Sequence, residues 1–202
     1  MYIAEYYTEC HIVAVTDSWI QADHIERECE SLGVTNVEVI TADIASFKWP
    51  SNRFDRVYGI GLARGLENTP ALFKQVAKSL KSRGKFFVEH YAHRTIHARA
   101  DRSLKVAGYF GVCTAEDLLL LDQSHFLVED RWVLDGRHAA QTFERWLHNL
   151  DRNADSLQAM LSELRSSIQL MRIRIYLQIL AELFGYANGC EWSPVQILFC
   201  RR

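Results

Sequence analysis

Short apolar runs alternate with longer segments of helical periodicity along the first part of the chain. The runs predict strands at His11–Thr16, Asn36–Ile40 and Phe54–Ile60. Between them, apolar positions recur every three or four residues, which predicts helices at Tyr2–Tyr7, Trp19–Leu32 and Thr69–Leu80. Because alternating strands and helices with short links form right-handed crossovers, the pattern predicts a mainly parallel sheet.

The stretch Gly84–His93 has the clearest strand pattern. Its apolar run, Phe86–Val88, ends abruptly in Glu89 and His90, which is typical of a buried parallel strand. Open α/β sheets bind ligands at the carboxyl ends of their strands, so Glu89 or His90 is a candidate general base or substrate-polarising group. The alternative for His90 is a ring satisfied by backbone hydrogen bonds. If the strand continues through both residues, their side chains lie on opposite faces.

The rest of the chain is richer in helical periodicity. Residues 92–111 are polar and predict a lid-like loop or a short helix. The segment Arg152–Phe184 fits one or two packed amphipathic helices, with a coiled-coil seam as the alternative. The other predicted elements are a helix at Thr114–Leu121, a strand at His125–Leu134, a helix at Thr142–Leu150 and a last, antiparallel strand at Val195–Cys200. The elements together predict an α/β fold with flanking helices and a long C-terminal helical segment.

Composition and charge narrow the functional classes. The chain has 202 residues, with 25 acidic and 23 basic side chains and no polybasic block, which argues against nucleic-acid binding. No apolar run is long enough to span a membrane. The first residues lack the pattern of a signal peptide, and the five cysteines are scattered and odd in number. We therefore expect a cytoplasmic protein with reduced thiols.

Two carboxylates lie in the polar exits of predicted strands. Asp17 stands where nucleotide-binding folds place an acid on ribose hydroxyls. The alternative is that either Asp17 or Ser18 caps the following helix. Asp43 follows the next strand, with an ordinary turn carboxylate as its alternative. His93 and His97 have i, i+4 spacing, but they lack further ligands at a fitting spacing, so we expect no metal site. Nothing in the sequence indicates a histidine positioned in the fold to activate one of the cysteines as a nucleophile.

Several segments in the same order carry a family resemblance. They are FFVEHYAHRT (86–95), WVLDGRHAAQTFERWLHNLD (132–151) and LFGYANGCEW (183–192), with YIAEYYTECHIVAVTDSWIQ (2–21) and VEVITADI (37–44). The chain resembles the S-adenosylmethionine-dependent methyltransferases of the coclaurine N-methyltransferase type, relatives of the cyclopropane fatty-acid synthases. The resemblance implies a Rossmann-like methyltransferase sheet, with S-adenosylmethionine across the strand ends and the nitrogen of a small amine as methyl acceptor.

The resemblance also implies roles for particular residues. Asp17 and Gln21 fall on the ribose side of the cofactor, where the family usually has Asn at the position of Asp17. Asp43 and Ile44 fall where the adenine is held. Glu89 and His90 border the acceptor pocket and are the implied catalytic residues. The chain is then a single truncated domain with a cofactor-side half, 1–100, and a substrate-side half, 101–202.

The chain departs from the family pattern at three places. The family's N-terminal helical region, a central strand and the glycine-rich loop that meets the cofactor would precede Tyr2–Tyr7, and we expect an incomplete sheet without them. Where the family has the acid/base cluster Glu-x-x-Glu-His, this chain has Gly61, Arg64 and Gly65. Ala139 stands where the fatty-acid synthases have the tyrosine of their bicarbonate site, which argues against cyclopropanation.

Three functional hypotheses follow from the pattern and its departures. In the first, the protein methylates an amine nitrogen. In the second, it is a catalytically degenerate module that binds a partner protein, and a homo- or hetero-oligomer covers the apolar surface left by the incomplete sheet. In the third, the chain is an N-terminally truncated product of a longer gene.

Overall fold

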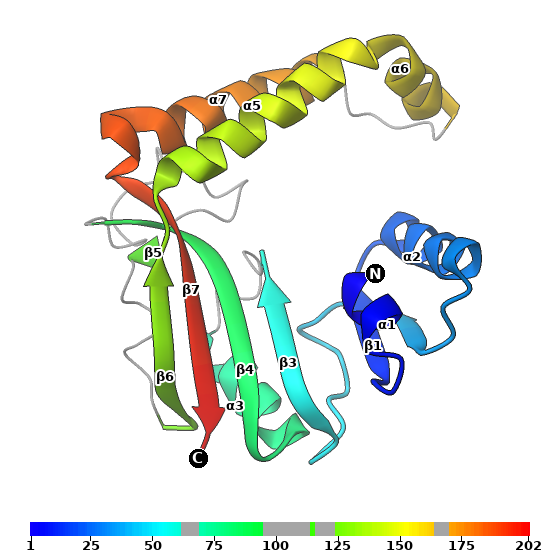
Figure 1. The fold of residues 1–202 in the computed structure, drawn as a ribbon, viewed down its shortest axis with the longest axis vertical. Coiled ribbons are helices and arrows are strands. Elements are labelled where there is room, and N and C mark those ends of the chain that lie inside the picture. The colour runs from blue at the N-terminus through cyan, green and yellow to red at the C-terminus, as the bar shows by residue number, and fades with distance from the viewer. Residues whose placement is uncertain (62–68, 95–113, 116–123, 164–169) are drawn as a thin grey trace. The chain divides into compact units, whose positions relative to one another are not determined.

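The computed structural model describes residues 1–61, 69–94, 114–115, 124–163 and 170–202. The chain folds as two compact units, Met1–Pro50 and Ser51–Arg202 (Figure 1). The predicted boundary between the two functional halves, at residue 100, lies outside the described residues.

The first unit is a small α/β layer built as the sequence predicts. Its elements are α1 (Tyr2–Tyr6), β1 (Ile12–Thr16), α2 (Trp19–Leu32) and β2 (Val37–Thr41). β1 and β2 pair in parallel, with Ile12 opposite Val37. α2 begins at Ser18, whose side chain accepts a hydrogen bond from Gln21 N, and ends at Gly33, whose φ of 66° is the left-handed conformation that glycine adopts without strain.

The second unit contains a mixed sheet with the strand order β3-β4-β7-β6. The strands are β3 (Phe54–Ile60), β4 (Leu80–His93), β6 (Phe126–Val133) and β7 (Trp192–Arg201), and the two-residue β5 (Thr114–Ala115) pairs with the end of β4. β3 and β4 are parallel, whereas β7 is antiparallel to both β4 and β6. The predicted α/β class, with a last antiparallel strand, is therefore confirmed.

One face of this sheet packs against α3 (Thr69–Ser79). Phe73 of α3 lies 5.3 to 5.6 Å, centroid to centroid, from the rings of Phe86, Phe126 and Phe199, which come from three different strands. All four rings are at most 1% exposed. Because edge-to-face ring contacts add to ordinary burial, this aromatic cluster is the main core of the sheet.

A helical layer follows β6. It contains α5 (Gly136–Arg152), α6 (Ala154–Glu163), α7 (Leu170–Gly185) and the short 3-10 turn η4 (Tyr186–Gly189). α5 and α7 lie side by side in Figure 1 and share a buried cluster with Trp192 of β7, which includes Ala139, Ala140, Phe143, Leu177, Leu180 and Phe184. The helix-periodic segment therefore forms packed amphipathic helices within the chain.

Some local predictions differ from the structure, and others fall outside the described residues. Thr114 and Ala115 form β5 rather than a helical start, because Ala92 and His93 at the end of β4 offer them backbone hydrogen-bond partners. The rest of that predicted helix, and residues 95–111 of the predicted lid, lie outside the described residues. β4 begins at Leu80, ahead of the predicted strand stretch Gly84–His93, and it bends at Arg83, which has a φ of 59°.

The sequence predicts an incomplete sheet. In the described part of the chain, β1 hydrogen-bonds to β2 and β3 to β4, in two separate sheets. Unpaired edges are thus the outcome for those residues.

Among the helices described, none is long and apolar enough to cross a bilayer.

Candidate functional site

The carboxyl ends of β1 and β2 lie together. Thr16 is opposite Thr41, and Ala42 N donates to Thr16 O at 2.8 Å. Asp17 directly follows β1 and Asp43 lies two residues after the end of β2, and both residues are exposed. The structure therefore brings together the two carboxylates that the sequence indicated as cofactor positions.

Asp17 is not the cap of α2. That role belongs to Ser18, whose Oγ accepts from Gln21 N at 3.4 Å. The Thr16 hydroxyl donates to Gln21 Oε1 at 2.6 Å and accepts from Ser18 N, which fixes the Gln21 side chain over the end of β1. The predicted ribose-side residues, Asp17 and Gln21, thus lie within one turn of each other at the same strand end.

Asp43 has the turn role that was its alternative. Its Oδ1 accepts from Ala45 N at 2.9 Å, an Asx turn that shapes the exit from β2. A carboxylate has a second oxygen and further lone pairs, so this turn and a ligand contact are compatible. Ile44 is half-buried beside it.

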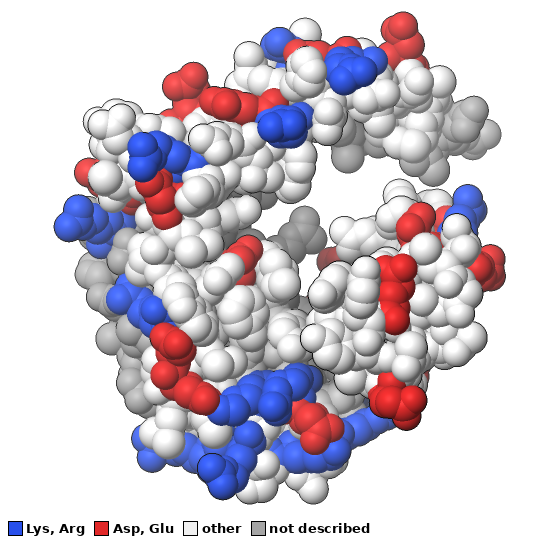
Figure 2. Space-filling view, in the orientation of Figure 1, with Lys and Arg blue, Asp and Glu red and all other residues white. Residues whose placement is uncertain are grey.

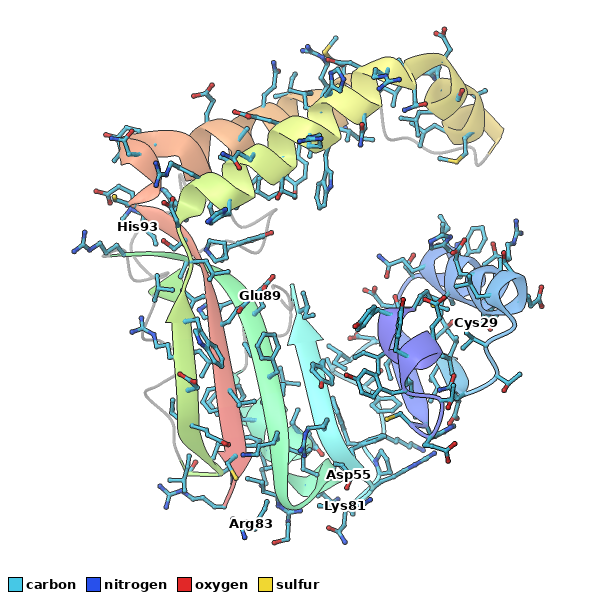
Figure 3. The ribbon with its side chains drawn as sticks, in the orientation of Figure 1. Cys29, Asp55, Lys81, Arg83, Glu89 and His93 are labelled. Carbon is cyan, nitrogen blue, oxygen red and sulfur yellow. The ribbon has the colours of Figure 1, made fainter. Side chains whose placement is uncertain are left out.

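Glu89 and His90 lie on opposite faces of β4, as the strand alternation predicts. Glu89 is half-buried and lies toward the end of β4 (Figure 3). It pairs in register with Gln196 of β7, whose Nε2 donates to Glu89 Oε2 at 2.6 Å. Its backbone oxygen accepts from Gly61 N at 3.2 Å, which holds the end of β3 beside it. Glu89 is therefore a fixed carboxylate at the exit of the central strands.

His90 is buried, with 3% of its surface exposed. Neither ring nitrogen has a hydrogen-bond partner among the residues that the structure describes, so no described backbone group satisfies the ring. Burial, and secondarily the positive charge of Arg131, lower the pKa of His90 to about 4. The ring is neutral at physiological pH and too weak a base there to remove a proton from an ammonium group.

His93 has a structural environment. Its Nε2 lies 3.3 Å from a carboxylate oxygen of Glu191, and its ring meets Trp192 edge-on at 4.7 Å between centroids. Within the described ranges, no three histidine, cysteine, aspartate or glutamate side chains gather in a way that could hold a metal ion. His97 lies outside those ranges.

Sequence reasoning missed the tyrosines that continue the Glu89 face. Tyr91 packs against Phe143 and Phe184, and its pKa is raised by burial and then by the Glu89 charge. The pKa of Tyr176 on α7 is raised by burial and then by Tyr91. The i, i+2 spacing from Glu89 to Tyr91 was a usable signal, because alternate strand residues share a face.

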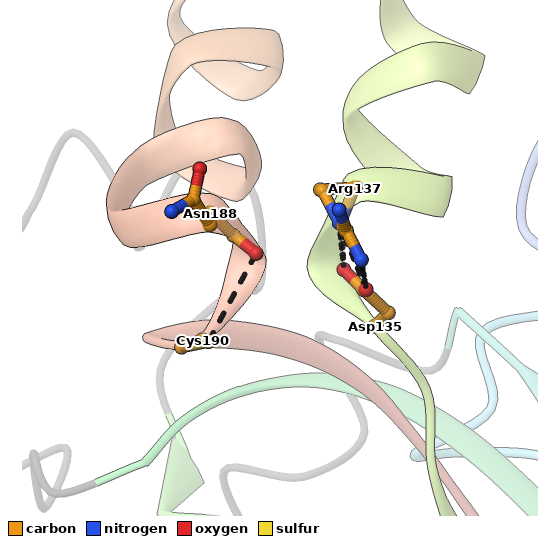
Figure 4. Close-up of polar contacts among 4 residues, drawn as sticks. All are labelled: Asp135, Arg137, Asn188 and Cys190. Atoms are coloured by element: carbon orange, nitrogen blue, oxygen red, sulfur yellow. Dashed lines mark hydrogen bonds and ion pairs between the residues drawn. The ribbon is translucent and has the colours of Figure 1, made fainter.

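Two of the segments that carry the family resemblance, 132–151 and 183–192, meet at the start of α5 (Figure 4). Asp135 caps the helix by accepting from Arg137 N at 2.8 Å, and the Arg137 side chain bonds the same carboxylate, which lowers the pKa of Asp135 to about 2. Opposite, Cys190 Sγ lies 3.9 Å from Asn188 O. A Cβ at Gly136 would clash with the carbonyl oxygens of Trp192 and Phe184, so this corner requires glycine. It is a packing motif that joins helix to sheet.

The structure describes two of the four positions that depart from the family pattern, Gly61 and Ala139. Gly61 follows β3 with a φ of 66°, while Arg64 and Gly65 lie outside the described residues. Ala139 is buried in the α5–α7 cluster, with 6% of its surface exposed, and it packs against apolar side chains there.

Two features characterise the fold. The second unit has a sheet with a parallel part and an antiparallel final strand, and the first unit has acids after two adjacent strand ends. A methyltransferase domain model matches residues 1–88. (S)-coclaurine N-methyltransferase of Papaver somniferum is 32% identical, and the match covers 98% of this chain and 60% of that protein. (S)-tetrahydroprotoberberine N-methyltransferase of Eschscholzia californica is 29% identical over 100% of this chain and 61% of its own length.

The chain is also similar to solved methyltransferase structures. Coclaurine N-methyltransferase bound to N-methylheliamine and S-adenosylhomocysteine superposes with a TM-score of 0.81 at 29% identity, over 98% of this chain and 60% of that one. A cyclopropane synthase of Mycobacterium tuberculosis, at 21% identity and a TM-score of 0.76 over 98% and 72%, shares the fold. The chain is therefore similar, over nearly its whole length, to S-adenosylmethionine-dependent methyltransferases such as coclaurine N-methyltransferase. It spans about 60% of the length of the curated relatives it matches.

Proposed function

We propose that this protein binds S-adenosylmethionine and takes part in methyl transfer to the nitrogen of a small amine. The observation that carries the proposal is the register of β1 and β2, which sets Asp17 and Asp43 at adjacent strand ends in a chain similar to this family.

The four described cysteines are free thiols, which suits a reducing compartment, so we propose that the protein is cytosolic.

The residues at the first unit's strand ends fit the nucleoside part of the cofactor. Carboxylates accept hydrogen bonds from ribose hydroxyls, and Asp17 is an exposed carboxylate beside the ordered Gln21 amide. Asp43 and the half-buried Ile44 offer one polar and one apolar contact to an adenine. When bound, S-adenosylmethionine supplies an electrophilic methyl group.

The acceptor side would act by binding and orientation. Glu89 is a fixed carboxylate that can accept a hydrogen bond from the N–H of a neutral amine, and Gln196 keeps one of its oxygens in place. His90 lies on the other face of β4 and is neutral, with its pKa near 4, so it does not serve as a strong base at the acceptor. We therefore propose that the acceptor nitrogen arrives unprotonated and that Glu89 positions the amine rather than deprotonating it.

Calorimetric titration with S-adenosylhomocysteine tests the cofactor site without requiring turnover. Asp17→Ala and Asp43→Ala should each weaken binding about 10-fold, because each removes a hydrogen bond to a charged group. Asp43→Asn, which keeps an oxygen for the Ala45 turn, separates loss of the turn from loss of the ligand contact. The matched control is Asp23→Asn on α2, which pairs with Arg27 away from the strand ends. A titration without heat, together with an unchanged melting temperature at millimolar ligand, would refute the proposal for this chain.

A further inference from the structure

The two faces of the β3–β4–β7–β6 sheet are covered unequally. α3 buries one face through Phe73. On the other face, Tyr58 and Ile60 of β3 are 58% and 65% exposed, and Leu127 and Trp132 of β6 are 47% and 39% exposed. Among the described residues, helices α5 and α7 meet this face at Tyr91, near the end of β4. Within the described part of the second unit, the parallel pair β3–β4 is thus open on one side, although parallel strands are normally covered on both.

The open face contains a hollow of about 300 Å³. It is lined by Arg56, Val57, Tyr58, Lys85, Phe87, Glu129 and Leu198. Tyr58 is opposite Phe87, and Phe87 is opposite Leu198, so an apolar row crosses three strands at its centre. A hollow of this size accommodates one or two large apolar side chains, as an anchored helix would present them.

Basic side chains border the hollow at the start of β3 and β4. Arg56 and Lys85 face each other in register, and Lys85 also pairs with Glu129. Figure 2 shows Lys and Arg gathered at this end of the sheet, and the labelled Lys81 and Arg83 lie there in Figure 3. Arg56 and Lys85 line the hollow itself. Arg53, Lys81, Arg83 and Arg202 are exposed at the adjoining strand ends, where Lys81 pairs with Asp55. The acids of the open face beside the hollow are Glu129 and Asp130.

We propose that this open face is a docking surface for an acidic amphipathic helix supplied by a partner protein. The apolar side of the helix would cover the row Tyr58–Phe87–Leu198, since a sheet face is buried by an adjacent layer. The helix runs antiparallel to β3 and β4, so that its C-terminal end, with its partial negative charge and its acidic side chains, lies at Arg56 and Lys85. Charge complementarity selects this occupant over a basic helix.

Peptide binding to the full 202-residue chain tests the surface. Two labelled peptides of about 18 residues share one leucine face, and their last two turns carry either glutamate or lysine. Fluorescence anisotropy at low salt should show the acidic peptide binding about 10-fold more tightly, a preference that added salt removes. Arg56→Glu should abolish the preference, and Tyr58→Asp should weaken both peptides. Arg152→Glu, on the far end of α5, is the matched control and should change neither.

The outcomes are separable. Tyr58 and Arg56 are exposed, so both variants should melt like the wild type; if Tyr58→Asp does not fold, Arg56→Glu alone still tests the preference. Equal affinity for the two peptides, or binding that Arg56→Glu leaves unchanged, would overturn the proposal. Light scattering that reveals a dimer broken by Tyr58→Asp would also overturn it, because the occupant is then a second copy of this chain.

Discussion

Gln196 donates a 2.6 Å hydrogen bond to the carboxylate of Glu89 from the directly opposite position on the neighbouring antiparallel strand. The pair joins β7 to β4 at the strand exit, on the face where Tyr91 follows. This geometry makes Glu89 a hydrogen-bond acceptor with a fixed position rather than a mobile surface acid.

Replacing Gln196 by Glu should destabilise the second unit by about 1 kcal/mol, because two carboxylates then face each other in place of a hydrogen bond. Urea unfolding measures the change. Adding Glu89→Gln should restore most of the loss, since the donor and acceptor are only exchanged. A double variant no more stable than Gln196→Glu alone would show that the pair does not interact.

The buried His90 predicts an acid-sensitive fold. Its pKa is about 4 in the folded protein and near 6.5 when unfolded, so between these values the unfolded chain binds the extra proton. Stability is therefore full above pH 6.5 and falls by up to about 3 kcal/mol as the pH approaches 4. Unfolding free energies across this range should lose much of their slope in His90→Leu.

His148→Gln is the control for that experiment, because His148 is exposed on α5. It should retain the wild-type slope. If His90→Leu and the wild type have parallel pH profiles, burial of the neutral ring is not the cause of the acid sensitivity.

Two glycines in the second unit should respond oppositely to alanine. At Gly136 a Cβ would come within 2.7 Å of Phe184 O and still closer to Trp192 O, so Gly136→Ala should cost about 3 kcal/mol. At Gly185 a Cβ would lie 3.8 Å from Ala140 Cβ, an ordinary contact, and α7 gains a better helix former. Thermal melts of both variants test the contrast; equal shifts would contradict it.

Asn36 organises the first unit through one amide. Its Nδ2 lies within hydrogen-bond distance of four backbone carbonyls, from Cys10 O at 2.9 Å to Thr8 O at 3.5 Å. Asn36→Ala should lower stability by about 1 kcal/mol. Asn36→Asp should be worse, because a carboxylate has no proton to donate and would face carbonyl oxygens. Hydrogen exchange of residues 4–16 measures both, and an Asp variant as stable as the wild type would argue against the contact.

Local sequence signals predicted the elements whose ends are defined by nearby residues. Ser18 and Gly33 bound α2, and the apolar run Phe54–Ile60 gave β3 its observed limits. Strand alternation also separated Glu89 from His90 correctly. These features depend on capping and periodicity, which act over a few residues.

The parts that sequence reasoning missed depend on distant partners. Gln196 could not be assigned to Glu89, because the register of β7 against β4 is set by packing over the whole sheet. β5 formed where the sequence predicted the start of a helix. Pairing with the backbone at the end of β4 stabilises Thr114 and Ala115 more than a capping box would. The apolar surroundings of the His90 ring likewise follow from three-dimensional burial, to which a single sequence gives no access.

The position of β7 between β4 and β6 also governs how the protein assembles. In the first unit, His11 and Glu38 meet across 27 positions, so the β1–β2 pair can close early and fast. Glu89 and Gln196 are 107 positions apart, and in the described sheet β6 is joined to β4 only through β7. The second unit thus has a late, entropically costly closing step, during which the aromatic face of β4 is exposed. Folding yield should therefore depend on chaperone supply far more for the second unit than for the first.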